Sequence, residues 1–240
     1  MFVERTDSTN TLMRELIAKG EWPKEECFLR AGYQTAGRGQ TGNGWESEQG
    51  KNLLCSILLP PRENLFELNI IVSVAVQRLL GEAFTIKWQN DIYWGDKKVA
   101  GILIETAIIG NKAAYAIAGI GLNVNQTEWQ SKAPNPISLK QICGQEYALE
   151  DLMQRLLAEI EKAQEKDVWA EYKAHLYRRD GFWPFVEREV STVPTMNAET
   201  KAKGQFMARI KDVLPSGEIL LEDTQGKERK YHFKQIRYVV

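Results

Sequence analysis

The hydrophobic pattern of the first half of the chain alternates between helical and extended spacing. Apolar residues recur at helical spacing after Ser8-Thr9-Asn10 and again over residues 65–81, so both segments are expected to form helices with one buried face. Gly20 should end the first helix. Two short apolar runs, residues 27–33 and 52–59, are typical of buried strands and lie on either side of a glycine-rich segment.

Extended patterns continue in the middle of the chain. Residues 85–94, 99–107 and 112–122 predict strands separated by short turns, which favours antiparallel pairing. Residues 149–160 then carry an apolar stripe at helical spacing, and residues 168–177 predict another short helix. Both helices are expected to pack on the core of the protein.

The pattern changes after residue 183, where short β-like runs separated by turns replace the longer elements. We therefore predict one domain over residues 1–183 and a small β domain over residues 184–240. The second domain is too small to be stable on its own core, so it should pack on the first. Its predicted strands are residues 206–210, 218–221, 230–233 and 236–240.

Composition excludes several classes of protein. With 31 basic and 32 acidic residues the net charge is −1, which gives no electrostatic reason to expect a DNA partner or an anionic membrane. The three cysteines, Cys27, Cys55 and Cys143, are widely spaced, which argues against a disulfide framework or a zinc site. No apolar run reaches the length of a membrane span, and the N-terminus lacks a signal-peptide core. The cytoplasm is the expected setting.

The glycine-rich segment, residues 33–45, contains four glycines and a single basic residue, Arg38. Backbone without Cβ atoms can approach an anion closely, so this segment is a candidate binding loop. It is not a P-loop, because Asn43-Gly44 stands where Lys-Ser/Thr is needed, and no amphipathic helix follows the glycines as a dinucleotide-binding unit requires. On these residues alone, a flexible surface loop remains the alternative.

Three other segments carry residues that a helix or strand alone does not require. Ser8-Thr9-Asn10 offers more capping groups than one helix end uses, so it is either a cap or a cap with groups to spare for a polar ligand. Lys87 lies in an apolar strand, where it either meets an anion or extends to solvent. Gly119 and Gly121 would weaken a strand unless a ligand or another backbone comes close.

Taken together, these segments resemble the motif set of biotin protein ligases. The matching residues are Ser8-Thr9-Asn10, the segment from Ala36 to Trp45, the segment from Lys87 to Asp91, and Val99 to Glu105 with Gly119 to Asn123. They occur in the order and approximate spacing of that family. The resemblance implies an α+β fold related to class II aminoacyl-tRNA synthetases and lipoate ligases, with a mixed sheet and helices. It also implies that residues 184–240 form a small SH3-like β-barrel.

The resemblance further implies a two-step reaction. Biotin and ATP, with Mg²⁺, would give biotinyl-5′-AMP and pyrophosphate, and a lysine of a biotin carboxyl carrier protein, such as that of acetyl-CoA carboxylase, would then take the biotinyl group. The alternative is a lipoate-protein ligase or octanoyltransferase, which shares the fold and a similarly placed lysine. The Gly-Arg-Gly sequence of the loop and the C-terminal β domain favour biotin.

Residue roles can be carried over from the resembling motifs. Arg38 and Lys87 would be catalytic, because they would meet the biotin carboxylate and the phosphate, and no residue is assigned to a metal. The residues implied for biotin are Ser8, Thr9, Asn10, Gln34, Gly37, Arg38, Gly39, Lys87 and Gly101. Those implied for ATP and the adenylate are Gln40, Trp45, Asn90, Asp91 and Asn123.

The chain departs from the family pattern at three positions. Gln40 and Asn43 stand where many members have Arg, and Gln89 stands where many have Pro. The lost charges would be offset by Arg38, Lys87 and the metal, or by another cation; the candidates are Lys51, Lys97 and Lys98. Too few residues precede Ser8 for a helix-turn-helix, so no DNA partner is expected, whereas exposed strand edges would allow a homodimer.

Overall fold

The computed structural model describes residues 1–25, 27–40, 43–109, 112–130, 135–188 and 202–239. A seven-stranded sheet forms the centre of the larger unit, with strand order β1-β2-β3-β7-β6-β5-β4. β1 and β2 pair in parallel and the other neighbours pair antiparallel, which makes the sheet mixed, as predicted. The strands are β1 (Phe2–Thr6), β2 (Phe28–Gln34), β3 (Leu53–Leu59), β4 (Phe84–Lys87), β5 (Asp91–Trp94), β6 (Lys97–Ile109) and β7 (Lys112–Leu122).

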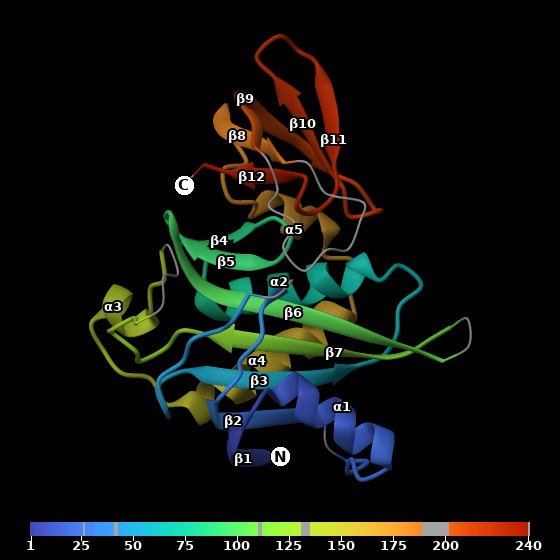
Figure 1. Ribbon diagram of the computed structural model, residues 1–240, viewed down its shortest axis with the longest axis vertical. Coiled ribbons are helices and arrows are strands. Elements are labelled where there is room, and N and C mark those ends of the chain that lie inside the picture. Colours follow the sequence, from blue (N-terminus) through green and yellow to red (C-terminus); the bar gives the residue numbers. More distant parts are fainter. Residues whose placement is uncertain (26, 41–42, 110–111, 131–134, 189–201, 240) are drawn as a thin grey trace.

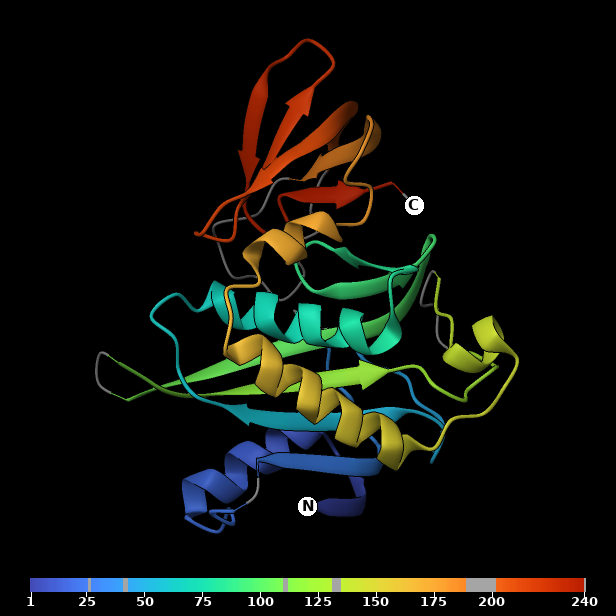
Figure 2. The same cartoon turned by 180° about the vertical axis from the view of Figure 1, so that it is seen from behind.

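Helices cover the two faces of this sheet unequally. α2 (Phe66–Leu80) and α4 (Leu149–Gln164) pack against each other and lie across the back face, where they enclose the main core (Figures 1 and 2). α1 (Thr9–Lys19) lies on the front face against β2, β3 and β7, and ends at Gly20 with φ of 72° as predicted. The short helices α3 (Leu139–Cys143) and α5 (Trp169–Ala174) complete the unit.

The alternation of side chains along β6 and β7 separates the core from the front face. Ile102 and Ile120 pair across the two strands and are buried in the core behind the sheet. Gly101 and Gly121, which also pair, face the opposite side. Because these two glycines have no side chains, the surface of the sheet at this point is bare, and α1 does not cover it.

The C-terminal unit is a five-stranded antiparallel sheet with strand order β11-β10-β9-β8-β12. Within the described residues its edge strands, β11 and β12, do not pair with each other, so a separate antiparallel sheet is present as predicted and its closure into an SH3-like barrel stays a prediction. The unit sits above the β4 and β5 end of the large sheet (Figure 1). Its strands are β8 (Trp183–Arg188), β9 (Ala202–Val213), β10 (Ile219–Asp223), β11 (Glu228–Tyr231) and β12 (Ile236–Tyr238).

Most of the predicted elements are present, but β1, β8 and α3 were not predicted, and the single strand predicted over residues 85–94 is instead the antiparallel pair of β4 and β5. β1 is short and largely exposed, so it has no clear apolar pattern, and β8 contains Pro184, which argued against a strand. α3 has 5 residues, little more than one helical turn, and begins with a capping box between Ser138 and Gln141. The second sheet begins with Trp183, and the domain boundary at residue 184 stays a prediction. Among the described helices, none has the length and apolar character needed to cross a membrane.

Candidate functional site

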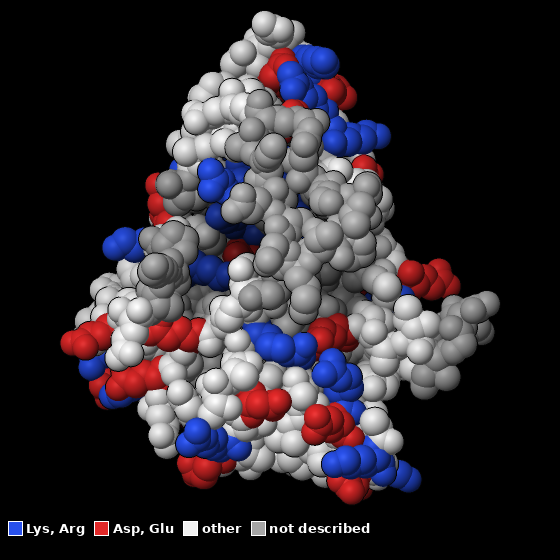
Figure 3. Space-filling model, viewed as in Figure 1, with Lys and Arg blue, Asp and Glu red and all other residues white. Residues whose placement is uncertain are grey.

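A two-lobed pocket opens on the front face of the large sheet, where basic side chains gather in the hollow below the C-terminal unit (Figure 3). The cavity volume is about 150 Å³ in its first lobe and about 820 Å³ in its second, and the second value lies within the range of roughly 300–1,000 Å³ for small-molecule sites. Most residues predicted for the site line this lobe: Ser8, Thr9, Asn10, Gln34, Arg38, Gly39, Gln40, Trp45, Asp91 and Gly101. The second lobe adds Gly37 and Asn123, and the two lobes share Gln34, Trp45, Asp91 and Lys98.

The Trp45 side chain lies on the bare centre of the sheet. A Cβ atom on Gly101 would be 2.7 Å from Trp45 Cζ3, and one on Gly121 would be 2.6 Å from Trp45 Nε1. Both distances are shorter than any real carbon contact, so the paired glycines make room for the indole ring. Gly101, predicted to contact biotin, and Gly121 therefore form a platform for Trp45, which lines both lobes of the pocket.

The glycines of the binding loop serve the loop itself. The Trp45 N–H donates to the Gly37 carbonyl (2.8 Å), and the Gly39 N–H donates to the Asn43 carbonyl (2.6 Å), so the segment folds back on itself. A Cβ atom on Gly37 would be 2.6 Å from the Trp45 carbonyl oxygen. These two glycines allow a close approach of the returning backbone, and the predicted approach to an anion stays a prediction. Thr41 and Gly42 of this segment lie outside the described residues.

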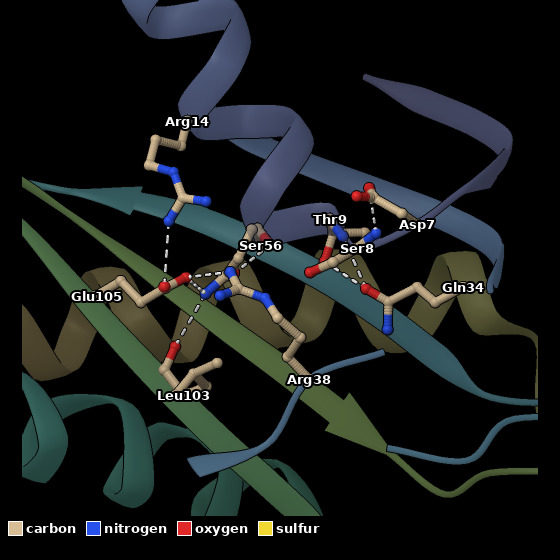
Figure 4. A network of polar contacts seen from close by, with 10 residues as sticks. Asp7, Ser8, Thr9, Arg14, Gln34, Arg38, Ser56, Leu103 and Glu105 are labelled. Carbon is tan, nitrogen blue, oxygen red and sulfur yellow. Dashed lines mark hydrogen bonds and ion pairs between the residues drawn. The ribbon is translucent and has the colours of Figure 1, made fainter. Parts of the chain in front are cut away.

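One carboxylate, Glu105 on β6, organises the polar end of the first lobe (Figure 4). It accepts hydrogen bonds from Arg38 (2.8 Å), from Arg14 (3.2 Å) and from the Asn10 amide (2.8 Å). The Asn10 amide oxygen in turn accepts from Ser56 (2.6 Å). The Asn10 side chain thus holds Glu105 and α1 together, and because Asn10 also lines the first lobe, its contact with biotin stays a prediction.

Gly119 explains how Asn10 reaches that position. A Cβ atom at Gly119 would lie 2.5 Å from the Asn10 amide oxygen, which is not possible. The glycine predicted to admit a ligand or a backbone therefore admits a side chain from α1.

The first turn of α1 supplies the remaining polar groups. Ser8 is the N-cap residue, yet its side chain makes no capping hydrogen bond, and it is buried in the lining of the pocket. The Thr9 N–H (2.7 Å) and hydroxyl (3.1 Å) both donate to the Gln34 amide oxygen, which fixes the orientation of the Gln34 amide. The Ser8 hydroxyl makes no capping hydrogen bond, which fits the prediction that Ser8-Thr9-Asn10 has polar groups beyond those that a cap needs.

The cation where the two lobes meet is Lys98. Its ammonium group lies 2.8 Å from Asp91 and 5.5 Å from the centre of the Trp45 ring. Gln40 and Asn90 lie next to this pair, and the Gln40 amide donates to the Asn90 oxygen (3.1 Å). Asn90 also donates to Asn69 (2.6 Å) and does not line either lobe, so it supports Gln40 from below instead of facing the pocket.

Three buried polar atoms border the second lobe without a hydrogen-bond partner among the described residues: Trp45 Nε1, Asn123 Oδ1 and Trp129 Nε1. The amide nitrogen of Asn123 donates to two backbone carbonyls, and its oxygen is left without a partner among the described residues. A buried polar group without a partner costs about 1–3 kcal/mol. This lobe therefore has the donors and the acceptor to receive a flat polar group such as a nucleobase.

Lys87 lies beside the pocket, outside the described lining of its two lobes. Its ammonium group donates to the Tyr93 hydroxyl (2.9 Å) and lies over the rings of Tyr93 (4.6 Å) and Tyr238 (5.4 Å). Tyr238 belongs to β12, so Lys87 lies between the large sheet and the C-terminal unit. Tyr93, its hydrogen-bond partner, lines the second lobe, so the contact of Lys87 with the biotin carboxylate stays a prediction, and Lys98, considered as a compensating cation, lines both lobes.

The environment of Lys87 gives a prediction for stability against pH. Burial lowers the pKa of Lys87 from 10.5 to about 8, although Asp91 acts in the opposite direction. Below about pH 8 the group is charged in both states and the full cost of burying the charge is present. Between pH 8 and 10.5 the unfolded chain keeps a proton that the folded chain has released, so stability rises with pH through this window.

We therefore expect Lys87→Met to be most favourable, relative to the wild type, below pH 8. The free energy of unfolding of the wild type, relative to that of Lys87→Met, should increase by on the order of 3 kcal/mol as the pH rises to the pKa of lysine in the unfolded chain. Urea unfolding of both proteins across this range measures the difference, in which other titrating groups cancel. A difference that does not change with pH would mean that Lys87 is not buried as a cation.

Leu103, which lines the first lobe, and Glu105, which holds Arg38 and Asn10 at its edge, were missed although a signal in the sequence could have revealed both. Gly101, Leu103 and Glu105 alternate along the predicted strand, so the placement of one on the front face implies the other two. Lys98 stands beside the glycine platform and was visible as an alternative cation. Phe233, which also lines the first lobe, comes from the turn between β11 and β12, and no local pattern indicates it.

Sequence comparison relates the chain to characterised ligases. It is 29% identical over 222 residues to "Bifunctional ligase/repressor BirA" of Bacillus subtilis, with 86% of this chain and 65% of that protein covered. It is 32% identical over 129 residues to "Biotin--[acetyl-CoA-carboxylase] ligase" of Paracoccus denitrificans, which covers 50% of this chain and 52% of that protein. The chain thus spans about two thirds or less of the length of these relatives.

Structure comparison supports the same fold. "Biotin protein ligase from Aquifex aeolicus in complex with biotin and ATP" superposes with a TM-score of 0.76 at 23% identity, covering 100% of this chain and 98% of that one. The biotin-bound ligase of Leishmania major gives a TM-score of 0.64 at 19% identity. The sequence from residue 2 to 123, about half of the chain, matches the Biotin/lipoate A/B protein ligase family. It includes α1, the binding loop, β6 and β7, so the chain belongs to the Biotin/lipoate A/B protein ligase family.

Proposed function

We propose that the protein is an ATP-dependent biotin protein ligase. It would form biotinyl-5′-AMP from biotin and MgATP and transfer the biotinyl group to a lysine of a biotin carboxyl carrier protein, in the cytoplasm. The observation that carries the proposal is the junction of the two lobes. One lobe ends in hydrogen-bonding groups, the other is bordered by polar atoms without partners, and Lys98 and Trp45 line both.

In this proposal the head group of biotin occupies the polar end of the first lobe. The Ser8 hydroxyl and the Gln34 amide face that end, and Thr9 holds the amide in place. The biotin chain then runs over the Trp45 ring toward Lys98. Adenine occupies the second lobe, where the Asn123 oxygen can accept a hydrogen bond from its amino group.

The first step joins two anions at the junction of the lobes. A carboxylate oxygen of biotin attacks the α-phosphorus of ATP, the bond from this phosphorus to the bridging oxygen breaks, and pyrophosphate leaves. Lys98 and Arg38 are the cations beside this point, and they reduce the repulsion between carboxylate and phosphate. Mg²⁺ arrives with ATP as part of the substrate. In the described residues no group of three or more metal-binding side chains is gathered to hold it separately.

The second step needs less from the protein. The amine of the carrier lysine attacks the acyl carbon of the mixed anhydride, the bond from this carbon to the phosphate oxygen breaks, and AMP leaves. Because the anhydride is already activated, positioning of the lysine suffices and no covalent bond to the enzyme is required.

Mass spectrometry of a carrier domain incubated with the protein and MgATP tests the proposal. Biotin should add one biotinyl group to the carrier, and lipoate or an octanoyl donor should add nothing. Transfer of lipoyl or octanoyl groups would support the alternative within the family. A carrier that none of the three acyl substrates modifies would refute both functions.

A further inference from the structure

The C-terminal unit contributes a side chain to the pocket. Phe233 lies in the turn between β11 and β12 and is among the residues that line the first lobe. The other described lining residues of this lobe belong to the first 121 residues of the chain. The ring is 37% exposed, so part of its surface is available on the side of the pocket.

The turn that carries Phe233 is held in one conformation. The Gln235 N–H donates to the His232 carbonyl (3.1 Å), and the His232 N–H donates to the Gln235 side chain (2.7 Å). Between them Lys234 has φ of 74°, a conformation that residues other than glycine seldom adopt. The ring is therefore presented by an ordered turn.

Trp88 connects this turn to the polar residues of the pocket. Its indole is 5% exposed, donates to the Gly217 carbonyl of the C-terminal unit (3.2 Å) and meets the Phe233 ring edge to face, with the ring centres 6.0 Å apart. Asn90 and Asp91 follow Trp88 in the chain and hold Gln40 and Lys98. The C-terminal unit thus contacts the segment that positions the Gln40 amide and the Lys98 ammonium group at the junction of the lobes.

We propose that Phe233 is a positioning residue that closes the pocket beside the reacting groups and keeps water from the adenylate. The proposal rests on the proposed ligase function. An apolar ring that lines the same lobe as the Lys98 and Asp91 ion pair excludes water and strengthens the electrostatic interactions around it. The C-terminal unit is then part of the active site, and its contact with Trp88 sets the distance between ring and ion pair.

The adenylate has two possible fates, which gives the proposal its test. In productive transfer the carrier amine attacks the acyl carbon and AMP leaves. In hydrolysis a water oxygen attacks the same carbon, the same bond to the phosphate oxygen breaks, and biotin and AMP are released without transfer. If Phe233 excludes water, its removal should raise the amount of AMP released for each biotin transferred.

The experiment compares Phe233→Ala with Phe182→Ala in the full chain. Phe182 is a suitable control, because it is 40% exposed, precedes β8 at the surface, packs only on Arg209 among the described aromatic and cationic contacts, and does not line the pocket. AMP and biotinylated carrier are quantified in the same reaction. We expect the ratio of AMP to biotinylated carrier to rise about fivefold in Phe233→Ala, and to stay at the wild-type value in Phe182→Ala.

Phe233→Leu tests whether the effect of Phe233→Ala comes from the loss of an apolar side chain over the pocket or from a general loosening of the structure. Leucine restores most of the apolar cover, so the ratio should return to within about twofold of the wild type. A merely structural defect would lower both products together and leave the ratio unchanged. An unchanged ratio in Phe233→Ala, with transfer by the wild type intact, overturns the proposal. A wild type that forms no biotinyl-5′-AMP would instead refute the ligase function itself.

Discussion

Lys98→Ala should lower the rate of pyrophosphate release from biotin and ATP by about 1,000-fold, the upper end of what the loss of one charge-stabilising group costs an enzyme. Lys98 is the cation that lines both lobes, and it lies against Asp91 and the Trp45 ring. Without it, the approach of the biotin carboxylate to the α-phosphate loses charge compensation, and Asp91 adds an uncompensated negative charge at the same point. A pyrophosphate-release assay under saturating substrates measures the effect.

Two neighbouring lysines provide the controls for this experiment. Lys97 is exposed and lies outside the lining of the pocket, so Lys97→Ala removes the same charge from the adjacent position and should leave the rate within about twofold of the wild type. Lys87→Ala removes the lysine that the motif suggested. A loss in Lys87→Ala as large as that in Lys98→Ala would return the catalytic role to Lys87 and contradict the assignment made from the pocket.

Gly121→Ala should reduce kcat/KM for biotin by about 100-fold while the protein stays folded, because small misplacements of a binding group have effects of this size. The added methyl group would overlap the Trp45 indole, so the ring must leave the platform. Trp45 is joined to Gly37 by a backbone hydrogen bond, and its displacement would carry the binding loop and Arg38 with it. Isothermal calorimetry with biotin and steady-state kinetics measure the loss.

Gly44→Ala is the matched comparison: Gly44 also lies in the binding loop and lines both lobes, but it has room for a Cβ atom. A Cβ atom at Gly44 would meet only the Gly37 carbonyl, at an ordinary distance of 3.7 Å, and Gly44 is not among the glycines with positive φ. We expect nearly wild-type kinetics. If Gly121→Ala bound biotin as the wild type does, Trp45 would not need the platform, and its place in the pocket would have to be reconsidered.

The sequence predicted the elements well where local pattern decides them. Helical spacing located α1, α2 and α4, and apolar runs located β2 and β3, because burial of one face imposes a period that is visible in the residues. Motifs found most of the pocket for a related reason. Residues such as Ser8, Gln34 and Arg38 lie at the ends of elements that converge on the front face, so their order in the chain reflects a common site.

The role of each lysine could not be predicted in this way. Lys87 and Lys98 both occur beside apolar strand residues, and the direction of each side chain depends on how β4, β5 and β6 pair. The register between β5 and β6 shifts after Ile92, and such an irregularity changes which side chains face the pocket. The pairing is a property of the whole sheet, so the sequence around either lysine does not reveal it.

By itself, therefore, the sequence determined the family, the succession of helices and strands, and the segments that form the site. Only the tertiary structure decided which residues meet at the pocket: that the glycines of β6 and β7 receive Trp45 and Asn10, and that Phe233 of the C-terminal unit lines the first lobe. The physical reason is that the period of a helix or strand is set by nearest neighbours along the chain. Close contacts are set by the space left between elements, which residues far apart in sequence define together.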